Sequence, residues 1–287
     1  MRFGLVPPIV HRNPRFAPPA WEFEATIDNL AAIAARADSL GYDFMCFPGH
    51  VAIPEEVADV RGHVYWDPVA TMSYIAAHTA RIKLCVYVVV LGYYHPLEIC
   101  KSYGSVDRLS GGRLILGVGV GSLEQEFKML GRPFADRGAR ADDSLRALRA
   151  SLSKRAPAYH GEFYDYEGFI VEPHALQDHV PVWIGGRSGR SLRRAVELAD
   201  GWSPFKLQVD ELRPILDRYR PQIEARGPGF DLVFPPDPPL DPLDDPDEAR
   251  DRIAAFKAVG ATGLALRFRH TSKEHYERQL EAFVRIV

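Results

Sequence analysis

Cysteine and long apolar runs are both scarce in this sequence. These two shortages exclude disulfide-rich proteins, thiolate metal proteins and proteins with membrane-spanning helices. The three cysteines, Cys46, Cys85 and Cys100, form no C-x-x-C pair, so neither a disulfide framework nor a thiolate metal centre is expected. The odd, sparse count indicates reduced thiols and a cytoplasmic location. No apolar run approaches the roughly 20 residues of a membrane-spanning helix, and the opening MRFGLVPPIV lacks the features of a signal peptide.

Neither sign of charge is in excess. The chain has 35 Lys and Arg against 38 Asp and Glu, a net charge of −3, so we expect no nucleic-acid partner and no membrane partner. Its 10 histidines include no H-E-x-x-H motif and no cluster with cysteine, so no metal site is expected. The 287 residues are 46% hydrophobic, as in a globular protein with a full-sized core. We find no linker and expect one domain over residues 1–287.

What the sequence does contain is a glycine-rich segment at residues 110–130, SGGRLILGVGVGSLEQEFKML. Its apolar run predicts a strand buried on both faces. Gly117, Gly119 and Gly121 then alternate with valine, a pattern found where a ligand or another backbone comes close. Ser122 with Gln125 matches a capping box and predicts a helix start. A strand, a glycine loop and a helix N-terminus suit an anion or a planar polar ring; tight packing without a ligand is the alternative.

The same segment partly matches a dinucleotide-binding motif. The spacing Gly117-x-Gly119 fits, and Asp136 stands at about 20 residues on, near the position of the ribose-binding acid. Ser122, however, occupies the place of the third glycine or alanine, and several predicted strands precede this one. We therefore disfavour a Rossmann domain.

Predicted strands alternate with predicted helices along the chain. We expect strands at residues 2–6, 43–47, 82–91, 113–118, 181–184, 202–205, 230–234 and 264–268. Helices are expected between them, including one over residues 22–40, whereas residues 51–66 read as a loop. Helix starts are signalled at Asp67-Pro68, at His95-Pro96 with Glu98, and at Asp245-Pro246 with Glu248. Eight such units predict an α/β fold, a single (β/α)8 TIM-like barrel with loop insertions.

In a barrel of this kind, functional residues lie on the loops after the carboxyl ends of the strands. That rim would carry His50, Tyr87, Val88, the segment Gly119-Val120-Gly121-Ser122 and the segment Gly185-Gly186-Arg187-Ser188. We also expect Ser188 to cap a helix. Lys206 follows the sixth strand, where some barrel aldolases place a Schiff-base lysine, so a non-redox lyase is an alternative.

Four segments resemble the luciferase-like monooxygenase superfamily, specifically its deazaflavin (coenzyme F420)-dependent oxidoreductases. They are LGYDFMCFPGH, DPVATMSYIAAHTARIKL, HPLEICKSYGSVDRLSGGRLILGVGVGSLEQEF and VPVWIGGRSGRSLRRAVELADGW, and they span most of residues 41–202. The resemblance implies a TIM-like barrel that binds F420 or, alternatively, the flavin FMN. The C-terminal third matches only in general layout.

The resemblance also implies roles for particular residues. In this family a strand bulge with a non-prolyl cis peptide lies behind the ring, and here it maps to Tyr87 and Val88. The loop beside the ring and its ribityl chain maps to Gly119, Val120, Gly121 and Ser122. The phosphate-binding loop maps to Gly185, Gly186, Arg187 and Ser188. Two departures are visible: Gly49 precedes His50 where many relatives have an aspartate, and Val120 stands where sugar-phosphate dehydrogenases have a glutamate.

Two side chains at this rim are the main candidates for chemistry. Histidine suits proton exchange near neutrality, so His50 is expected to transfer a proton or to bind substrate; a hydrogen-bonded loop histidine is the alternative. Arg187, beside two glycines and a helix start, suits a phosphate contact; a solvated charge is the alternative. Because Gly49 has no side chain, either the backbone or a residue of another loop orients His50, or His50 is a looser, substrate-binding group.

We therefore expect a cytoplasmic F420-dependent oxidoreductase that moves a hydride between the deazaflavin and a small organic substrate. An FMN-dependent luciferase-like monooxygenase on the same scaffold is the first alternative. A non-redox lyase and a cofactor-binding protein without catalysis are the others. A homodimer is also expected.

Overall fold

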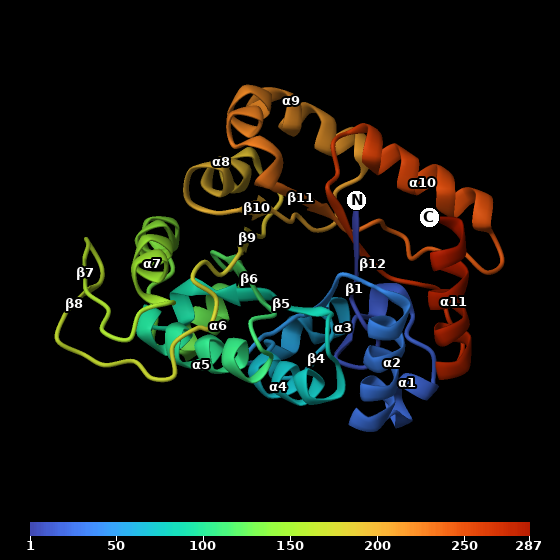
Figure 1. Ribbon diagram of the computed structural model, residues 1–287, viewed down its shortest axis with the longest axis horizontal. Coiled ribbons are helices and arrows are strands. Elements are labelled where there is room, and N and C mark those ends of the chain that lie inside the picture. The colour runs from blue at the N-terminus through green and yellow to red at the C-terminus, as the bar shows by residue number, and fades with distance from the viewer.

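The computed structural model describes residues 1–287 and contains a closed barrel of parallel strands (Figure 1). Every neighbouring pair in the barrel is parallel, and β12 pairs with β1 to close it. The predicted TIM-like barrel is therefore confirmed. Around the barrel the strands follow the order β1 (Arg2–Leu5), β3 (Phe44–Phe47), β5 (Lys83–Val90), β6 (Leu114–Gly119), β9 (Val182–Ile184), β10 (Gly201–Trp202), β11 (Asp231–Phe234) and β12 (Gly263–Leu266).

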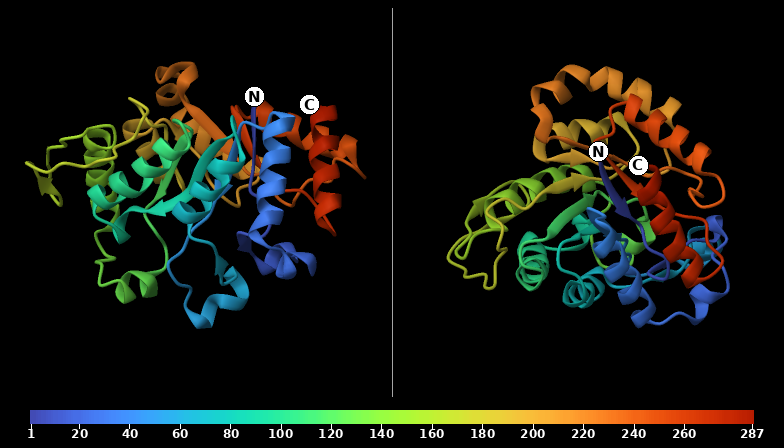
Figure 2. Two further views of the ribbon diagram at one scale, coloured as in Figure 1. Left: turned by 60° about the horizontal axis from the view of Figure 1, so that its bottom comes forward. Right: turned by 45° about the vertical axis from the view of Figure 1, so that its right-hand side comes forward.

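Helices between the strands surround the barrel (Figures 1 and 2). The predicted caps are present: Asp67 accepts the amide N–H of Ala70 at 2.8 Å, and His95 and Glu98 form a capping box. Such side chains satisfy amide groups that the first helical turn leaves unpaired. The helices are α2 (Ile27–Leu40), α4 (Pro68–His78), α5 (Pro96–Leu109), α7 (Arg137–Ser151), α8 (Gly189–Leu198), α9 (Val209–Ala225), α10 (Pro246–Ala258) and α11 (Lys273–Ile286).

Apolar side chains fill the barrel interior as well as the layer between strands and helices. Phe44 on β3 and Trp183 on β9 meet edge to face with ring centroids 5.2 Å apart, although two strands separate β3 from β9. Such a contact crosses the interior. Cys46 and Cys85 belong to the same interior cluster and are fully buried, as is typical of structural thiols. Burial raises the pKa of Cys85 well above its usual range.

The predicted element boundaries differ from the structure in the loops. The helix expected over residues 22–40 is split into α1 (Trp21–Glu24) and α2, because Ala25 is extended and Thr26 caps the second helix. The strand expected at 202–205 is only Gly201–Trp202, since Pro204 has no N–H for a ladder. Residues 51–66 contain α3 (Ala58–Arg61) and β4 (Val64–Tyr65), and β4 pairs antiparallel with β2 (His11–Arg12).

The capping box expected at Ser122 and Gln125 is also absent. Helix α6 (Glu124–Met129) begins later, with Leu123 at its N-cap and no side-chain cap. Leu123 is 5% exposed, and Gly121 turns the chain with φ +80°. Burial of Leu123 thus decides the helix start, and Ser122 stays exposed.

Two further features complete the fold. The hairpin of β7 (Tyr159–His160) and β8 (Asp165–Tyr166) projects away from the barrel (Figure 1). No helix combines the length and apolar character that crossing a membrane requires.

Candidate active site

The structure brings the predicted rim residues to one end of the barrel. His50, the Tyr87–Val88 pair, the loop after Gly119 and the loop after Ile184 belong to β3, β5, β6 and β9, which are consecutive neighbours. Because these strands are parallel, their carboxyl ends share one rim. The segments containing α1, α3 and α6 extend from that same end (Figure 2, left).

Strand β5 is irregular at the expected place. The Tyr87–Val88 peptide bond is cis, and the register with β6 shifts between Val86 and Val89. Tyr87 and Val88 are half-buried. The Tyr87 hydroxyl donates a hydrogen bond to the Pro204 carbonyl at 3.0 Å. The bulge that the resemblance implies is thus present, and its role toward a ring stays a prediction.

The glycines beside this bulge have a packing role. A Cβ atom added to Gly119 or to Gly185 would lie 3.0 Å from a methyl carbon of Val88, closer than nearly all real Cβ contacts. At Gly121 an added Cβ would lie 2.6 Å from the Phe127 ring. Close packing therefore accounts for these three glycines without a ligand. Val120, half-buried, and Ser122, exposed, are the other members of the β6 loop.

The loop after β9 ends in a capped helix. Gly186 has φ +105°, and the Ser188 hydroxyl accepts the amide N–H of Ser191 at 3.4 Å, so the predicted cap is confirmed. The exposed Arg187 guanidinium lies 5.3 Å from the centroid of the Phe205 ring. It forms no ion pair with any carboxylate of the chain, which leaves its charge available to an anionic ligand.

His50 is held by a carboxylate from another loop. Its Nδ1 lies 2.8 Å from Oε2 of Glu126 on α6, and the Tyr93 hydroxyl donates to the same oxygen at 2.6 Å. The other carboxylate oxygen accepts the amide N–H of Val51 at 2.8 Å and that of Ala52 at 3.3 Å. A carboxylate at this distance accepts a hydrogen bond from Nδ1–H, and Nε2 has no hydrogen-bond partner in the chain.

Glu126 is 1% exposed and remains ionised. Burial acts to raise the pKa of Glu126, but hydrogen bonds from His50, Tyr93 and the Val51 amide outweigh it, and the pKa is lowered. This carboxylate supplies the acidic neighbour that Gly49 does not. We did not predict Glu126 from the sequence. The available signal was its place in SLEQEFKML, next to Phe127 on the face that Leu123 and Phe127 bury.

Aromatic rings connect His50 to the loop after β1. Tyr65 on β4 meets His50 edge to face with centroids 4.8 Å apart, and it stacks on His11 of β2 at 4.5 Å. Burial, and then the charge of Arg267, lower the pKa of His11 to about 3. This ring is therefore neutral. The β2–β4 pair places both rings beside His50.

Lys206 stands at the rim in a group of basic side chains. Its φ is +56°, and its side chain is exposed. Burial first, and then the charges of Arg15, Arg187 and Arg61, lower its pKa. Asp237 is the acid of this group and pairs with Arg15 at 2.7 Å. An exposed lysine among arginines differs from the apolar pocket that activates a Schiff-base lysine.

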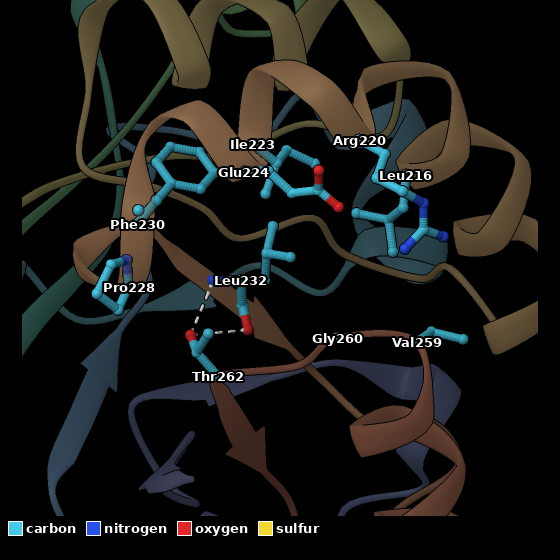
Figure 3. Close-up of a pocket in the computed structure, with 11 residues that line it drawn as sticks. Leu216, Arg220, Ile223, Glu224, Pro228, Phe230, Leu232, Val259, Gly260 and Thr262 are labelled. Atoms are coloured by element: carbon cyan, nitrogen blue, oxygen red, sulfur yellow. Dashed lines mark hydrogen bonds between the residues drawn. The ribbon is translucent and has the colours of Figure 1, made fainter.

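A cavity of about 240 Å³ lies at the opposite end of the barrel (Figure 3). Leu216 and Ile223 of α9 face it, together with Phe230 before β11 and Thr262 before β12. The Thr262 hydroxyl accepts a hydrogen bond from the amide N–H of Leu232 at 2.9 Å. None of the rim residues borders this cavity, and we place no active site there.

Solved structures share this architecture. The monooxygenase RslO1 from Streptomyces bottropensis has a TM-score of 0.81 at 20% identity, with 100% of this chain and 98% of that chain covered. The oxygenating constituent of 3,6-diketocamphane monooxygenase from Pseudomonas putida, in complex with FMN, has a TM-score of 0.72 at 18% identity, with the same coverage of 100% and 98%. Likeness at these identities shows the fold.

Sequence comparison is more specific. An uncharacterised protein of Mycobacterium tuberculosis is 29% identical over 207 residues, which are 68% of this chain and 71% of that protein. The F420-dependent glucose-6-phosphate dehydrogenase of Amycolatopsis mediterranei is 27% identical over 195 residues, 65% of this chain and 57% of that enzyme. The family model described as luciferase-like monooxygenase matches residues 1–285. The chain therefore belongs to the luciferase-like monooxygenase family.

Proposed function

We propose that this protein is an F420-dependent oxidoreductase that moves a hydride between the deazaflavin and a small organic substrate, with His50 transferring the proton. The observation that carries the proposal is the His50–Glu126 pair, 2.8 Å apart, beside the β5 bulge at the carboxyl end of the barrel. An oriented histidine with one free nitrogen at such a rim suits acid–base chemistry.

The residues present fit a phosphate-bearing ring cofactor. Arg187 has no carboxylate partner and adjoins the N-terminus of α8, where amide groups favour an anion. Tyr87 and Val88 would lie behind the ring, with Val120 and Ser122 at its side. When bound, the cofactor supplies hydride chemistry at the central carbon of its ring. The protein contributes binding and orientation.

In this proposal, His50 exchanges a proton with a substrate oxygen through Nε2. Glu126 holds Nδ1–H and stabilises the imidazolium that forms when Nε2 takes a proton. Tyr93 and the amide groups of Val51 and Ala52 fix the carboxylate. Glu126 is thus a positioning residue, and His50 is the catalytic one.

Support for F420 over FMN comes from the four sequence segments and from the Amycolatopsis relative. Val120 replaces the glutamate of sugar-phosphate dehydrogenases, so we do not propose sugar-phosphate oxidation. An FMN-dependent monooxygenase is the second candidate, because the diketocamphane enzyme shares the fold and is an FMN complex. A homodimer also remains our prediction.

Parallel titrations of the purified protein with F420 and with FMN, followed by fluorescence, test the assignment. We expect F420 to bind more tightly. FMN binding that equals or exceeds F420 binding would overturn it in favour of the second candidate.

A further inference from the structure

Unpaired buried polar groups gather where β1 and β12 end. Folded proteins pair nearly all such groups, so a local cluster of exceptions needs an explanation. Both ring nitrogens of His11 are buried and have no hydrogen bond of good geometry within the chain, although the backbone of Arg61 is close enough to raise the pKa of His11 against the effect of burial. Tyr276, near the start of α11, is 1% exposed, and its hydroxyl is also unpartnered.

Arg267, the first residue after β12, is a third unpaired group. Its half-buried guanidinium lies 4.7 Å from the centroid of the Phe16 ring and forms no hydrogen bond or ion pair with the chain. The carboxylate of Asp237 acts on the charge of Arg267, but its Oδ2 is ion-paired with a nitrogen of Arg15 2.7 Å away. Burial lowers the pKa of Arg267 despite Tyr87 and Asp237. A desolvated charge is costly unless a partner compensates it.

These groups share one region at the mouth of the barrel. Phe16, whose ring the Arg267 guanidinium approaches, follows β2, the strand that carries His11. Tyr276 packs edge to face on Phe268, the residue next to Arg267, with ring centroids 6.1 Å apart. The pairing of β1 with β12 brings these loops together, and the charge of Arg267 acts on the pKa of both His11 and Tyr276.

The unpaired atoms of these three side chains are mostly hydrogen-bond donors, and the carboxylate oxygen of Asp237 that also lacks a hydrogen bond lies 2.7 Å from a nitrogen of Arg15. A guanidinium has five N–H donors and no acceptor, and a neutral imidazole has one of each. The Tyr276 hydroxyl is free to donate as well. A ligand group with several acceptor oxygens and a negative charge matches this set, and a carboxylate or a phosphate fits the guanidinium fork.

We propose that Arg267, His11 and Tyr276 form a binding site for a carboxylate or phosphate group of the substrate. The cofactor is the other source of such an anion. Arg187, our candidate for the cofactor phosphate, follows β9, which β10 and β11 separate from β12. Only β1 lies between β12 and β3, and the Tyr65 ring contacts both His11 and His50. The site is thus on the His50 side of the mouth.

Anion binding to the purified, cofactor-free chain tests the site. Inorganic phosphate and benzoate would be titrated by calorimetry at constant ionic strength in chloride, with neutral benzamide as the uncharged control. The wild-type protein should bind both anions and not benzamide. Arg267→Gln should weaken anion binding by about one to two decades. The exposed Arg269 provides the matched control, and Arg269→Gln should change nothing.

Arg267→Lys keeps the charge without the fork and should bind with intermediate affinity, and it serves as the test if Arg267→Gln fails to fold. Anion affinity that both variants leave unchanged, or a wild-type protein that binds neither anion, overturns the proposal. F420 titration separates the two sources. An unchanged F420 dissociation constant in Arg267→Gln supports the substrate site, whereas an F420 loss as large as the phosphate loss assigns the anion to the cofactor and overturns it.

The assignment to substrate rests on the proposed function, but the calorimetry does not depend on it. If FMN outcompetes F420 while Arg267→Gln still abolishes phosphate binding, the cofactor proposal fails and the anion site stands. If F420 binds and neither anion does, the cofactor proposal stands and the anion site fails.

Discussion

The two ends of the barrel differ in whether their polar groups find hydrogen-bond partners within the chain. At the amino end, carboxylates are saturated by the chain itself. Asp107 is fully buried and accepts hydrogen bonds from the amides of Leu114, Leu176 and Gln177. Asp38 accepts the successive amides of Ala80, Arg81 and Ile82. These bonds fasten the helix ends to the strand starts.

At the carboxyl end, several charged and polar groups have no hydrogen-bond partner in the chain. They are Nε2 of His50 and the guanidinium groups of Arg187 and Arg267, and His11 and Tyr276 also have unpaired buried atoms. Polar groups that are satisfied within the chain contribute to stability, whereas unsatisfied ones at a barrel mouth indicate a binding site. Substitutions at the two ends should therefore affect different measurements.

The largest effect is expected at His50. If Nε2 exchanges a proton with substrate, His50→Ala should lower turnover by roughly 10²–10⁴-fold, with F420 affinity nearly intact. The exposed His63 gives a matched control, and His63→Ala should keep full activity. Steady-state kinetics with reduced cofactor and a panel of enones and nitroaromatics provides the measurement. Wild-type rates in His50→Ala on any accepted substrate remove His50 from catalysis.

The amino end should respond in stability instead. Asp107→Ala leaves several buried amides without an acceptor and should lower the free energy of unfolding by about 3 kcal/mol. Urea denaturation followed by circular dichroism measures this, with Asp251→Ala at an exposed position of α10 as the control. Equal stability of the two variants would show that the amino end is not the stabilising one.

Glu126 combines features of both ends. It lies at the carboxyl end, yet both of its carboxylate oxygens accept hydrogen bonds from the chain. Glu126→Gln removes the charge that stabilises the imidazolium and should lower turnover by about one to two decades. Both kcat and kcat/KM should fall, with F420 affinity unchanged. A purely structural role would lower the melting temperature and leave the turnover of the folded variant unchanged.

The same residue predicts an acid effect on stability. Because the pKa of Glu126 is lowered by folding from 4.5, its ionisation adds stability that is fully present above that value. This stability is lost as the pH falls through the lower pKa of the folded state. Glu126→Gln should therefore lose stability less steeply than wild type between pH 5 and acid unfolding. Parallel slopes in melting temperature against pH would contradict this.

A smaller effect is expected at Arg187. The side chain is exposed, so Arg187→Ala should weaken F420 binding by about tenfold and leave the melting temperature of the apo protein unchanged. Arg193 on the same helix pairs with Glu197 at 3.8 Å, and Arg193→Ala is the control. An unchanged dissociation constant in Arg187→Ala would place the phosphate elsewhere.

No effect is expected in the test of the lyase alternative. Borohydride with a carbonyl substrate traps a Schiff-base lysine as a covalent adduct. Lys206 is exposed among arginines, so mass spectrometry should show no adduct on it. An adduct that Lys206→Arg abolishes would revive the lyase.

Local signals in the sequence predicted most of the barrel because they follow strand and helix periodicity. The caps at Asp67, His95 and Ser188 were read correctly, since a helix start depends on neighbouring residues. The cap predicted at Ser122 is absent, because the burial of Leu123 depends on tertiary contacts that neighbouring residues do not reveal, and this burial outweighs a cap.

The candidate site was predictable only in part. His50 and Arg187 follow strands with clear patterns, and the family resemblance located the bulge. Glu126 could not be assigned, because its partner lies 76 positions away in sequence. His11 and Arg267 carry no motif, and they lie near opposite ends of the chain, which the pairing of β1 with β12 brings together.

The three thiols are buried in different layers of the barrel, so their reactivity can report the order in which those layers unfold. Cys46 and Cys85 sit inside the strand cylinder, while Cys100 is on α5 in the outer layer, and all are fully buried. An alkylating reagent reaches such sulfurs only while the surrounding segment is open. The order in which the thiols react during a denaturant pulse therefore reports whether the helical layer detaches before the cylinder comes apart.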